Sequence, residues 1–378
     1  MIFQKLEHYI PEALLLLFTF CFVVQMCFLL IQQRRFAAYK VPDVQIQETA
    51  IPVSVIISAR NEAENLSRFL PAILAQNYHK YEVVVINDCS TDQSDLILLN
   101  LCENHPHLKL VTVTEHRRFK TGKKFALTMG IKAATYEHLI FTDADCEPAS
   151  PQWVARMAAN FTGETEIVLG YSPYIRARGF INAFTRYETL KTAINYLSAA
   201  LGRNAYMGIG RNLAYTKSLF FKNKGFASHL HVMAGDDDLF VNKNATPKNT
   251  VIEVHPETFM FTEAKSKIGA YYRQKKRHMG VGALYRGKHR FALSLEAMTG
   301  FLFYVALGFC VYFQQYPIML AGAYLVRMVT QLVVYYISAK KLTGKDLLWL
   351  IPFFDLFYYL YLNIFGLIGT FIKTTQWK

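Results

Sequence analysis

The hydrophobic residues of this chain form long unbroken runs near both ends and short runs between them. One run without a formal charge covers residues 14–31, and three more cover 297–313, 317–339 and 347–372. A membrane-spanning helix needs about 20 consecutive apolar residues, so each run predicts a transmembrane helix. A cleaved signal peptide is the alternative for the first run. It is disfavoured because the polar residues 32–35 follow in place of a small-residue cleavage site.

Two of these runs are interrupted by charged residues. The third run contains Arg327, and the fourth contains Pro352 and Asp355. A charge inside a membrane helix usually faces other helices or water. We therefore expect Arg327 and Asp355 to have partners among the helices rather than a catalytic role. Pro352 and Asp355 also leave open a fourth run that breaks into a re-entrant or interfacial pair.

Between the runs, segments with strand and helix patterns alternate. Apolar, β-branched runs predict strands at 52–59, 82–86, 108–113, 138–141 and 167–169. Helical spacing of apolar residues predicts helices at 62–76, 92–103, 123–134 and 151–160. This alternation predicts a parallel β-sheet that is covered by helices on both faces.

The length and charge of the chain constrain its organisation. With 378 residues, it has room for one domain of about 230 residues plus membrane segments, or for two soluble domains. The net charge is +13, and basic residues gather at 33–40 and 265–290, beside the predicted spans. Positively charged loops stay in the cytoplasm, which places the N-terminus outside and residues 32–292 in the cytoplasm. We expect an integral protein of the cytoplasmic (inner) membrane of a bacterium.

The position of the basic clusters also indicates their partner. Basic residues beside membrane spans favour anionic lipid headgroups, and we expect no nucleic acid partner. The six cysteines show no CxxC pair and no Cys/His metal spacing, which predicts a reduced cytosolic compartment without disulfides or zinc.

Polar residues follow three of the predicted strands at the point where each strand ends. They are residues 60–62, 87–88 and 142–145. Asp and Asn are also common in turns and helix caps, so any one of these sets is unremarkable by itself. The carboxyl ends of parallel strands meet at one edge of a sheet, where ligands bind. Three polar sets at that edge predict a binding site.

The third set contains two acids with one residue between them, Asp143 and Asp145. Alternate residues of an extended segment point to the same side, so these carboxylates converge. A hard divalent cation, Mg²⁺ or Mn²⁺, would stabilise the pair and would also bind a diphosphate. An isolated DxD pattern is common by chance, and its meaning depends on the neighbouring motifs.

Those neighbours carry a family resemblance. The segments VSVIISARNEAENL (53–66), VVVINDCSTD (83–92), GKKFAL (122–127) and FTDADCEP (141–148) resemble family 2 glycosyltransferases in order and spacing. The resemblance implies an α/β fold of the GT-A type, a Rossmann-like nucleotide-diphospho-sugar transferase domain, flanked by transmembrane helices.

The resemblance also implies domain boundaries and a donor site. We expect an N-terminal transmembrane anchor at 1–35, a cytoplasmic GT-A domain at 50–285 and a C-terminal region of about three hydrophobic segments at 291–378. By resemblance, Asp145 would hold the metal together with Asp143. The expected nucleotide-sugar site consists of Arg60, Glu62, Asp88, Lys123, Lys124 and Asp143.

Three further motifs resemble the acceptor side of the family. The segment YMGIGRNLAY (206–215) resembles the glycine-rich acceptor segment, with a simple turn before a strand as the alternative. AGDDDLF (234–240) resembles the catalytic acidic motif, which assigns the base to Asp237 and leaves Asp236 and Asp238 open. A solvated helix start is the alternative here. The expected acceptor and diphosphate residues are Asp236, Gly210, Arg211, Asn212, Gln274, Arg277 and His278.

The third of these motifs departs from the family. RQKKRHMG (273–280) resembles QxxRW, with Gln274, Arg277 and His278 at the motif positions, so His278 stands where the family has Trp. Arg277 would offset charge on the leaving UDP. Without the aromatic residue, processive polymer synthesis is less favoured. The alternative is a basic helix beside the membrane.

The resemblance implies an inverting, hexosyltransferase-type enzyme. It would use Mg²⁺ or Mn²⁺ to move a sugar from a UDP-sugar to a lipid or glycan acceptor, with a base that takes the acceptor proton. Three alternatives remain open: a processive polysaccharide synthase, a nucleotidyl- or phosphosugar-transferase, and a non-catalytic membrane scaffold or transporter component.

Overall fold

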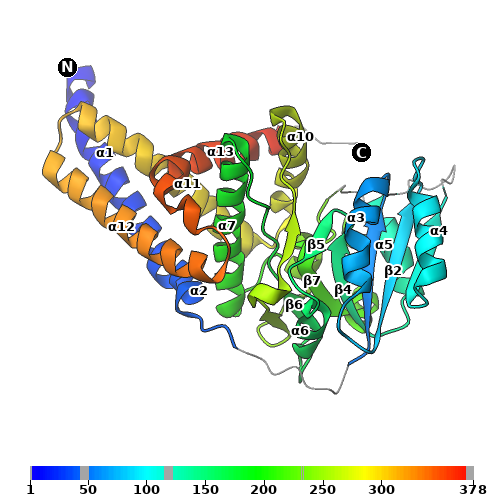
Figure 1. Cartoon of the computed structure of the whole chain (residues 1–378). Coiled ribbons are helices and arrows are strands. Elements are labelled where there is room, and N and C mark those ends of the chain that lie inside the picture. The colour runs from blue at the N-terminus through cyan, green and yellow to red at the C-terminus, as the bar shows by residue number, and fades with distance from the viewer. Residues whose placement is uncertain (1, 43–50, 115–121, 231, 233, 372–378) are drawn as a thin grey trace.

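A computed structural model describes residues 2–42, 51–114, 122–230, 232 and 234–371. Figure 1 shows an elongated molecule with long helices at one end and a β-sheet covered by shorter helices at the other. The helix α7 (Phe180–Leu201) lies where the two parts meet. The structure therefore joins a membrane-type bundle directly to an α/β unit.

The main sheet has seven strands in the order β3-β2-β1-β4-β7-β6-β8. β1 pairs in parallel with both β2 and β4, and β2 pairs in parallel with β3. The strands are β1 (Val53–Ala59), β2 (Tyr81–Asp88), β3 (Leu108–Val113), β4 (His138–Asp143), β6 (Ile167–Leu169), β7 (Leu213–Thr216) and β8 (Thr250–Ile252). A separate pair consists of β5 (Cys146–Pro148) and β9 (Met260–Thr262).

The prediction of a purely parallel sheet is wrong at one strand. β7 lies between β4 and β6 and pairs with both in the antiparallel direction. The first four strands and β6 run parallel to one another, as predicted. The short apolar run that forms β7 carries no information about direction, because that depends on where the preceding helix delivers the chain.

Helices cover both faces of the sheet, as the alternation of segments predicts. Val55 and Ile57 of β1 pack with α3, α4 and α6, while Ile56 faces α5 and α7 on the other side. The covering helices are α3 (Ala63–Leu74), α4 (Ser94–Asn104), α5 (Lys123–Ala133) and α6 (Trp153–Ala159). Shorter elements follow: η2 (Gly210–Asn212), α8 (Lys217–Lys222), η3 (Ala227–His229), α9 (Asp238–Asn244), η4 (Pro256–Thr258), α10 (Ile268–Met279) and η5 (Gly282–Leu284).

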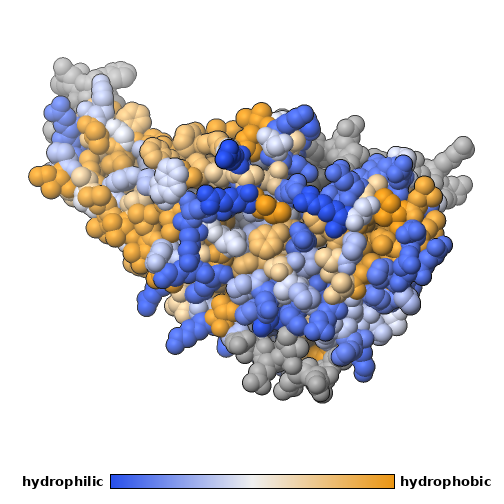
Figure 2. Space-filling view, in the orientation of Figure 1, coloured by the Kyte–Doolittle hydropathy of each residue, from blue (hydrophilic) through white to orange (hydrophobic). Residues whose placement is uncertain are grey.

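Four helices in the described residues are long and apolar enough to cross a membrane. They are Ile10–Ala38, Gly287–Tyr312, Pro317–Lys341 and Lys345–Gly366. The first consists of α1 (Ile2–Cys27), the π-helical turn η1 (Phe28–Gln33) and α2 (Arg34–Ala38), and the next two are α11 and α12. Figure 2 shows hydrophobic residues exposed over much of these helices. Such a surface suits contact with lipid tails.

The last of these helices is continuous. A 3₁₀ segment, η6 (Lys345–Leu350), leads into α13 (Ile351–Phe371). Pro352 is the second residue of α13, a position where its missing N–H removes no helical hydrogen bond. Pro352 therefore marks the change from 3₁₀ to α-helix and does not divide the segment in two.

The two charged residues expected to have partners within the bundle pair with each other. Arg327 of α12 and Asp355 of α13 form an ion pair of 2.8 Å, and both side chains are almost fully buried. Asp355 also pairs with Lys191 of α7 at 3.0 Å. The prediction that Arg327 and Asp355 have partners among the helices is confirmed, and α7 is tied to α13 by charge.

Candidate active site

The polar sets predicted at the strand ends lie along one edge of the sheet. Ser58 of β1 is in register with both Asp143 of β4 and Ile86 of β2. Asp88 ends β2 and is fully buried. Arg60 follows β1, and Glu62 is the N-cap residue of α3. Pairing of the parallel strands thus places these chain positions at neighbouring strand ends.

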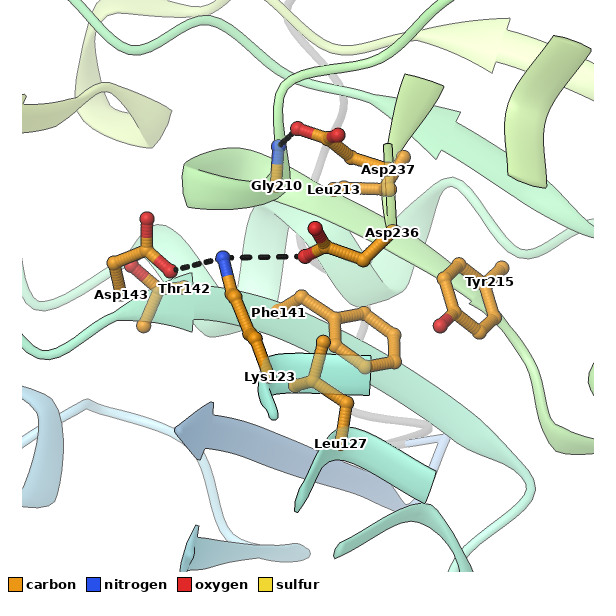
Figure 3. A pocket seen from close by; sticks show the side chains of 10 residues that line it. All are labelled: Lys123, Leu127, Phe141, Thr142, Asp143, Gly210, Leu213, Tyr215, Asp236 and Asp237. Atoms are coloured by element: carbon orange, nitrogen blue, oxygen red, sulfur yellow. Dashed lines mark hydrogen bonds and ion pairs between the residues drawn. The ribbon is translucent and has the colours of Figure 1, made fainter. Parts of the chain in front are cut away.

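A cavity with an empty volume of about 280 Å³, partly open to solvent, lies at this edge (Figure 3). Its walls come from α5, the end of β4, the η2 turn, β7 and the loop before α9. Five of the lining residues are predicted site residues from four separate motifs. The lining residues are Lys123, Leu127, Phe141, Thr142, Asp143, Gly210, Leu213, Tyr215, Asp236 and Asp237.

Lys123 lies between two carboxylates in this cavity (Figure 3). Its Nζ atom is 2.9 Å from Oδ1 of Asp143 and 3.1 Å from Oδ2 of Asp236. Burial alone would lower the pKa of Lys123, but the negative charges of Asp143, Asp236 and Asp237 outweigh it and raise the pKa. Lys123 is therefore an ammonium ion that links the DxD motif to the GDDD motif.

Asp237 holds the glycine-rich turn in place. Its Oδ2 accepts a hydrogen bond of 2.7 Å from the N–H of Gly210, and its Oδ1 accepts one of 2.8 Å from the N–H of Asp238. A Cβ on residue 210 would lie 3.1 Å from Oδ2, tighter than ordinary contact. The glycine thus lets the backbone approach the carboxylate closely. The η2 turn precedes strand β7, as the alternative of a simple turn expects. Both elements also form part of the cavity wall.

The three adjacent acids differ in their surroundings. Asp236 and Asp237 line the cavity, whereas Asp238 is the first residue of α9 and is not part of the lining. Burial and the nearby charge of Asp236 raise the pKa of Asp237, while Lys123 and the two backbone N–H groups oppose this. A carboxylate with a raised pKa accepts a proton more readily near neutral pH.

Asp145 lies among opposing charges. Burial raises its pKa, Asp143 adds to this effect, and Arg211 opposes it. The guanidinium of Arg211 stacks over the ring of Tyr174 with its Cζ 4.5 Å from the ring centroid. Gln274 of α10 donates a 3.4 Å hydrogen bond to the hydroxyl of Tyr174. These contacts connect residues predicted for the metal, the glycine-rich turn and the QxxR motif.

The donor set near this edge fits a divalent metal that arrives with a diphosphate. In the described part of the chain, no group of three or more His, Cys, Asp or Glu side chains is arranged to hold a metal ion. Asp145 and Asp143 supply two carboxylates, the second of which contacts Lys123. Mg²⁺ is usually bound by one or two carboxylates, with substrate phosphates completing its coordination.

Lys124 does not face the cavity. Its buried Nζ donates hydrogen bonds of 2.7–2.8 Å to the carbonyl oxygens of His229, Val232 and Ala234. Burial lowers the pKa of Lys124 to about 8. Of the two candidate lysines, Lys123 reaches the cavity, and Lys124 ties α5 to the segment before the GDDD motif.

Asn212 also lies away from the cavity, in the core. Its Nδ2 donates to the carbonyl oxygens of Tyr171 and Thr258, and its Oδ1 accepts from the indole N–H of Trp153. These bonds occupy the side-chain amide, and the residue is fully buried. Asn212 therefore stabilises the core, in place of the acceptor contact that the sequence predicted. Arg277 and His278 lie in α10, and their side chains are outside the described residues.

Sequence reasoning missed Tyr174 and Glu188. Glu188 of α7 is buried and contacts Lys275 and Tyr271 of α10 and Tyr361 of α13. Neither residue belongs to a recognisable motif, and the contacts of Glu188 join segments more than 80 residues apart. The sequence contained no local signal that could have identified them.

The α/β unit is similar to known glycosyltransferases. Residues 54–222 match the model of the glycosyl transferase family 2. The chain is 29% identical over 180 residues to a poly-β-1,6-N-acetyl-D-glucosamine synthase of Staphylococcus aureus strain COL, covering 43% of this chain and 42% of the synthase. It thus matches less than half the length of that relative.

Two further comparisons cover more of the chain. It is 29% identical over 268 residues to the glycosyltransferase AglE of Haloferax volcanii, covering 66% of this chain and 81% of AglE. The structure of the mannosyltransferase PcManGT from Pyrobaculum calidifontis, in complex with GDP-Man and Mn²⁺, superposes with a TM-score of 0.58 at 20% identity. It covers 87% of this chain and 97% of PcManGT, which shows a common fold.

Proposed function

We propose that this chain, whose residues 54–222 match the model of the glycosyl transferase family 2, is an inverting, metal-dependent enzyme moving a sugar from a UDP-sugar to a lipid or glycan acceptor. The observation that carries this proposal is the cavity at the sheet edge. There, Asp143 and Lys123 from the donor motifs face Asp236 and Asp237 from the acceptor motif.

The donor lies along the strand ends in this proposal. Arg60, Glu62, Asp88 and Asp143 bind the nucleoside, because they follow neighbouring parallel strands where ligands bind in such sheets. Uridine is proposed from the family resemblance. The complex of PcManGT with GDP-Man makes a GDP-sugar the second donor to test.

Mg²⁺ or Mn²⁺ is the proposed cofactor, held by Asp145 and Asp143. When bound, such an ion neutralises negative charge on the diphosphate and so assists departure of the nucleotide. The complex of PcManGT with Mn²⁺ supports a divalent metal in this fold. Arg211 acts on the charge of Asp145, and Lys123 pairs with Asp143, so both residues would supply further positive charge.

Asp237 is the proposed base. The acceptor oxygen attacks the anomeric carbon, the bond from that carbon to the diphosphate oxygen breaks, and the hydroxyl proton passes to Asp237. The nucleoside diphosphate leaves with the bonding electron pair. Asp237 suits this role because it lines the cavity and its pKa is raised by burial and by Asp236. Gly210 positions the carboxylate through its N–H.

The acceptor is proposed to lie at the membrane surface. The α/β unit packs through α7 and α10 onto helices long enough to span a bilayer, which brings the cavity near lipid. The basic residues beside the spans suit anionic headgroups on the cytoplasmic side of a bacterial inner membrane. His278 in place of Trp favours transfer to a lipid or short glycan. The resemblance to a polysaccharide synthase keeps processive synthesis as the second candidate.

The test is nucleoside diphosphate release by the full chain in lipid nanodiscs. A panel of UDP- and GDP-sugars is supplied with Mn²⁺ or Mg²⁺, and the Asp237→Asn variant is the control. We expect metal-dependent release from one donor in the wild type, and loss of transfer with retained nucleotide binding in the variant. Release of pyrophosphate or UMP would indicate the other transferase classes. Retained transfer in Asp237→Asn would exclude this base, and product length by mass spectrometry separates single from processive transfer.

A further inference from the structure

We propose that Lys123 is an internal counter-ion that disfavours metal binding to the cavity until a nucleoside diphosphate arrives, and that it then moves to the diphosphate. This inference deepens the proposed function and rests on it. It predicts that metal and nucleotide bind synergistically, with the lysine as the cause.

The ammonium group of Lys123 lies between two carboxylates of the cavity. Lys123 Nζ contacts Asp143 at 2.9 Å and Asp236 at 3.1 Å, and these carboxylates come from β4 and from the loop before α9. A divalent ion held by Asp143 would lie next to this ammonium and be repelled by it. The carboxylate of Asp143 cannot bind both the ammonium group and the divalent ion at full strength.

Metal ligands are scarce at this edge of the sheet. Within the described residues, no three side chains of the ligand types converge, so the described side chains offer Asp145 and Asp143. Two carboxylates, one of them already engaged by Lys123, hold a divalent ion weakly. A bound diphosphate changes both conditions, because its oxygens complete the coordination and its negative charge attracts the lysine.

The place of Lys123 in its helix is unfavourable for a positive charge. It is the first residue of α5, where the helix dipole favours anions and disfavours cations. Lys124, the next residue, is held by three carbonyl oxygens and stabilises the fold. No comparable carbonyl contact holds Lys123 among the described residues. Its partners are two carboxylates that face the cavity, so its charge serves the cavity rather than the helix.

The experiment measures Mn²⁺ binding to the full chain, without turnover. The protein is placed in nanodiscs of zwitterionic lipid, so that headgroups do not bind the ion, and free Mn²⁺ is followed by electron paramagnetic resonance. The titration is run with Mn²⁺ alone and then with UDP or GDP. Lys123→Met removes the charge at similar length, and Lys123→Arg retains it. Lys132→Met, on the exposed side of the same helix, is the matched control.

We expect Lys123→Met to bind Mn²⁺ alone roughly tenfold more tightly than the wild type, because repulsion is removed. The same variant should bind the nucleotide more weakly and lose most of the synergy. Lys123→Arg and Lys132→Met should resemble the wild type in the titration with Mn²⁺ alone. Thermal unfolding verifies that each variant is folded, and Lys123→Gln replaces the Met variant if that one is not.

Equal Mn²⁺ affinity in Lys123→Met and Lys132→Met would overturn the proposal. So would unchanged nucleotide binding in Lys123→Met. If neither UDP nor GDP binds to the wild type, the proposed donor class fails. The titration with Mn²⁺ alone still decides whether the lysine opposes the metal, so the two failures are distinguishable.

Discussion

The Nη2 atom of Arg327 lies 2.8 Å from Oδ2 of Asp355, and Oδ1 of the same carboxylate lies 3.0 Å from Nζ of Lys191. Gln331 donates a further 2.7 Å hydrogen bond to Oδ1. One buried carboxylate thus joins α12, α13 and α7, the helix that connects the bundle of long helices to the α/β unit. The stability of the whole molecule should depend on this contact.

We expect Asp355→Ala to lower the free energy of unfolding by about 3–5 kcal/mol, because it leaves two buried cations without their main partner. Glu263→Gln is the matched control. It breaks an ion pair with Arg68 in which both side chains are more than half exposed, and should cost at most about 1 kcal/mol. Thermal and denaturant unfolding of the full chain in detergent measures both. Similar small losses would show that the buried pair contributes little.

Gly210→Ala should reduce transfer strongly while leaving the protein folded. The added Cβ would lie 3.1 Å from Oδ2 of Asp237, so the backbone or the carboxylate must shift. A displaced base loses much of the roughly 10²–10⁴-fold rate contribution of general base catalysis. Gly308→Ala in α11 is the control, since nothing lies within 4 Å of its added Cβ. Steady-state rates and melting temperatures are compared. A Gly210→Ala enzyme with wild-type turnover would contradict the assignment.

The pH profile of transfer should report the surroundings of Asp237. A base must be deprotonated, so activity falls as the pH drops through its pKa, which burial and Asp236 raise above the ordinary 3.8. Asp236→Asn removes the negative charge that raises this pKa, so the acid limb should move to lower pH. Lys123→Met removes a positive charge that lowers it, so the limb should move to higher pH.

Profiles of kcat/KM against pH are measured for both variants, and the Lys132→Met variant serves as the reference. Opposite shifts are the expected result. Shifts in the same direction, or none, would indicate that the acid limb belongs to another group.

The position of α10 should depend on Glu188. Lys275 lies 2.5 Å from its Oε2, the Tyr271 hydroxyl donates to Oε2 at 3.2 Å, and the Tyr361 hydroxyl donates to Oε1 at 3.1 Å. Glu188→Gln should speed amide hydrogen exchange in α10 and raise KM for the acceptor more than it changes donor binding, because α10 carries Gln274. The double variant Glu188→Lys with Lys275→Glu restores the opposite charges and should recover part of both effects.

Unchanged exchange in α10 after Glu188→Gln would show that packing alone holds the helix. A loss of donor binding equal to the loss of acceptor binding would place the effect on the whole cavity instead. The Glu263→Gln variant again provides the exposed comparison.

Much of the architecture followed from local patterns. Four hydrophobic runs, the order of strands and helices, and the edge at which polar residues gather were all predictable, because side-chain spacing and strand-end geometry act over a few residues. The motifs around Asp143, Lys123 and Asp237 were recognisable through their resemblance to family 2 glycosyltransferases. The sequence also indicated that Arg327 and Asp355 would need partners, since isolated charges are costly in a bundle.

The partners themselves were decided only by the tertiary structure. Nothing local distinguishes Lys123, which bridges Asp143 and Asp236, from Lys124, which binds carbonyl oxygens in the core. Three other features also depend on contacts between segments far apart in the chain. They are the antiparallel direction of β7, the burial of Asn212 and the contacts of Glu188. Propensity and spacing determine which elements form and which faces are apolar. The choice of partner for each charge depends on distances set when those elements pack, because electrostatic and hydrogen-bond energies change steeply over a few ångströms.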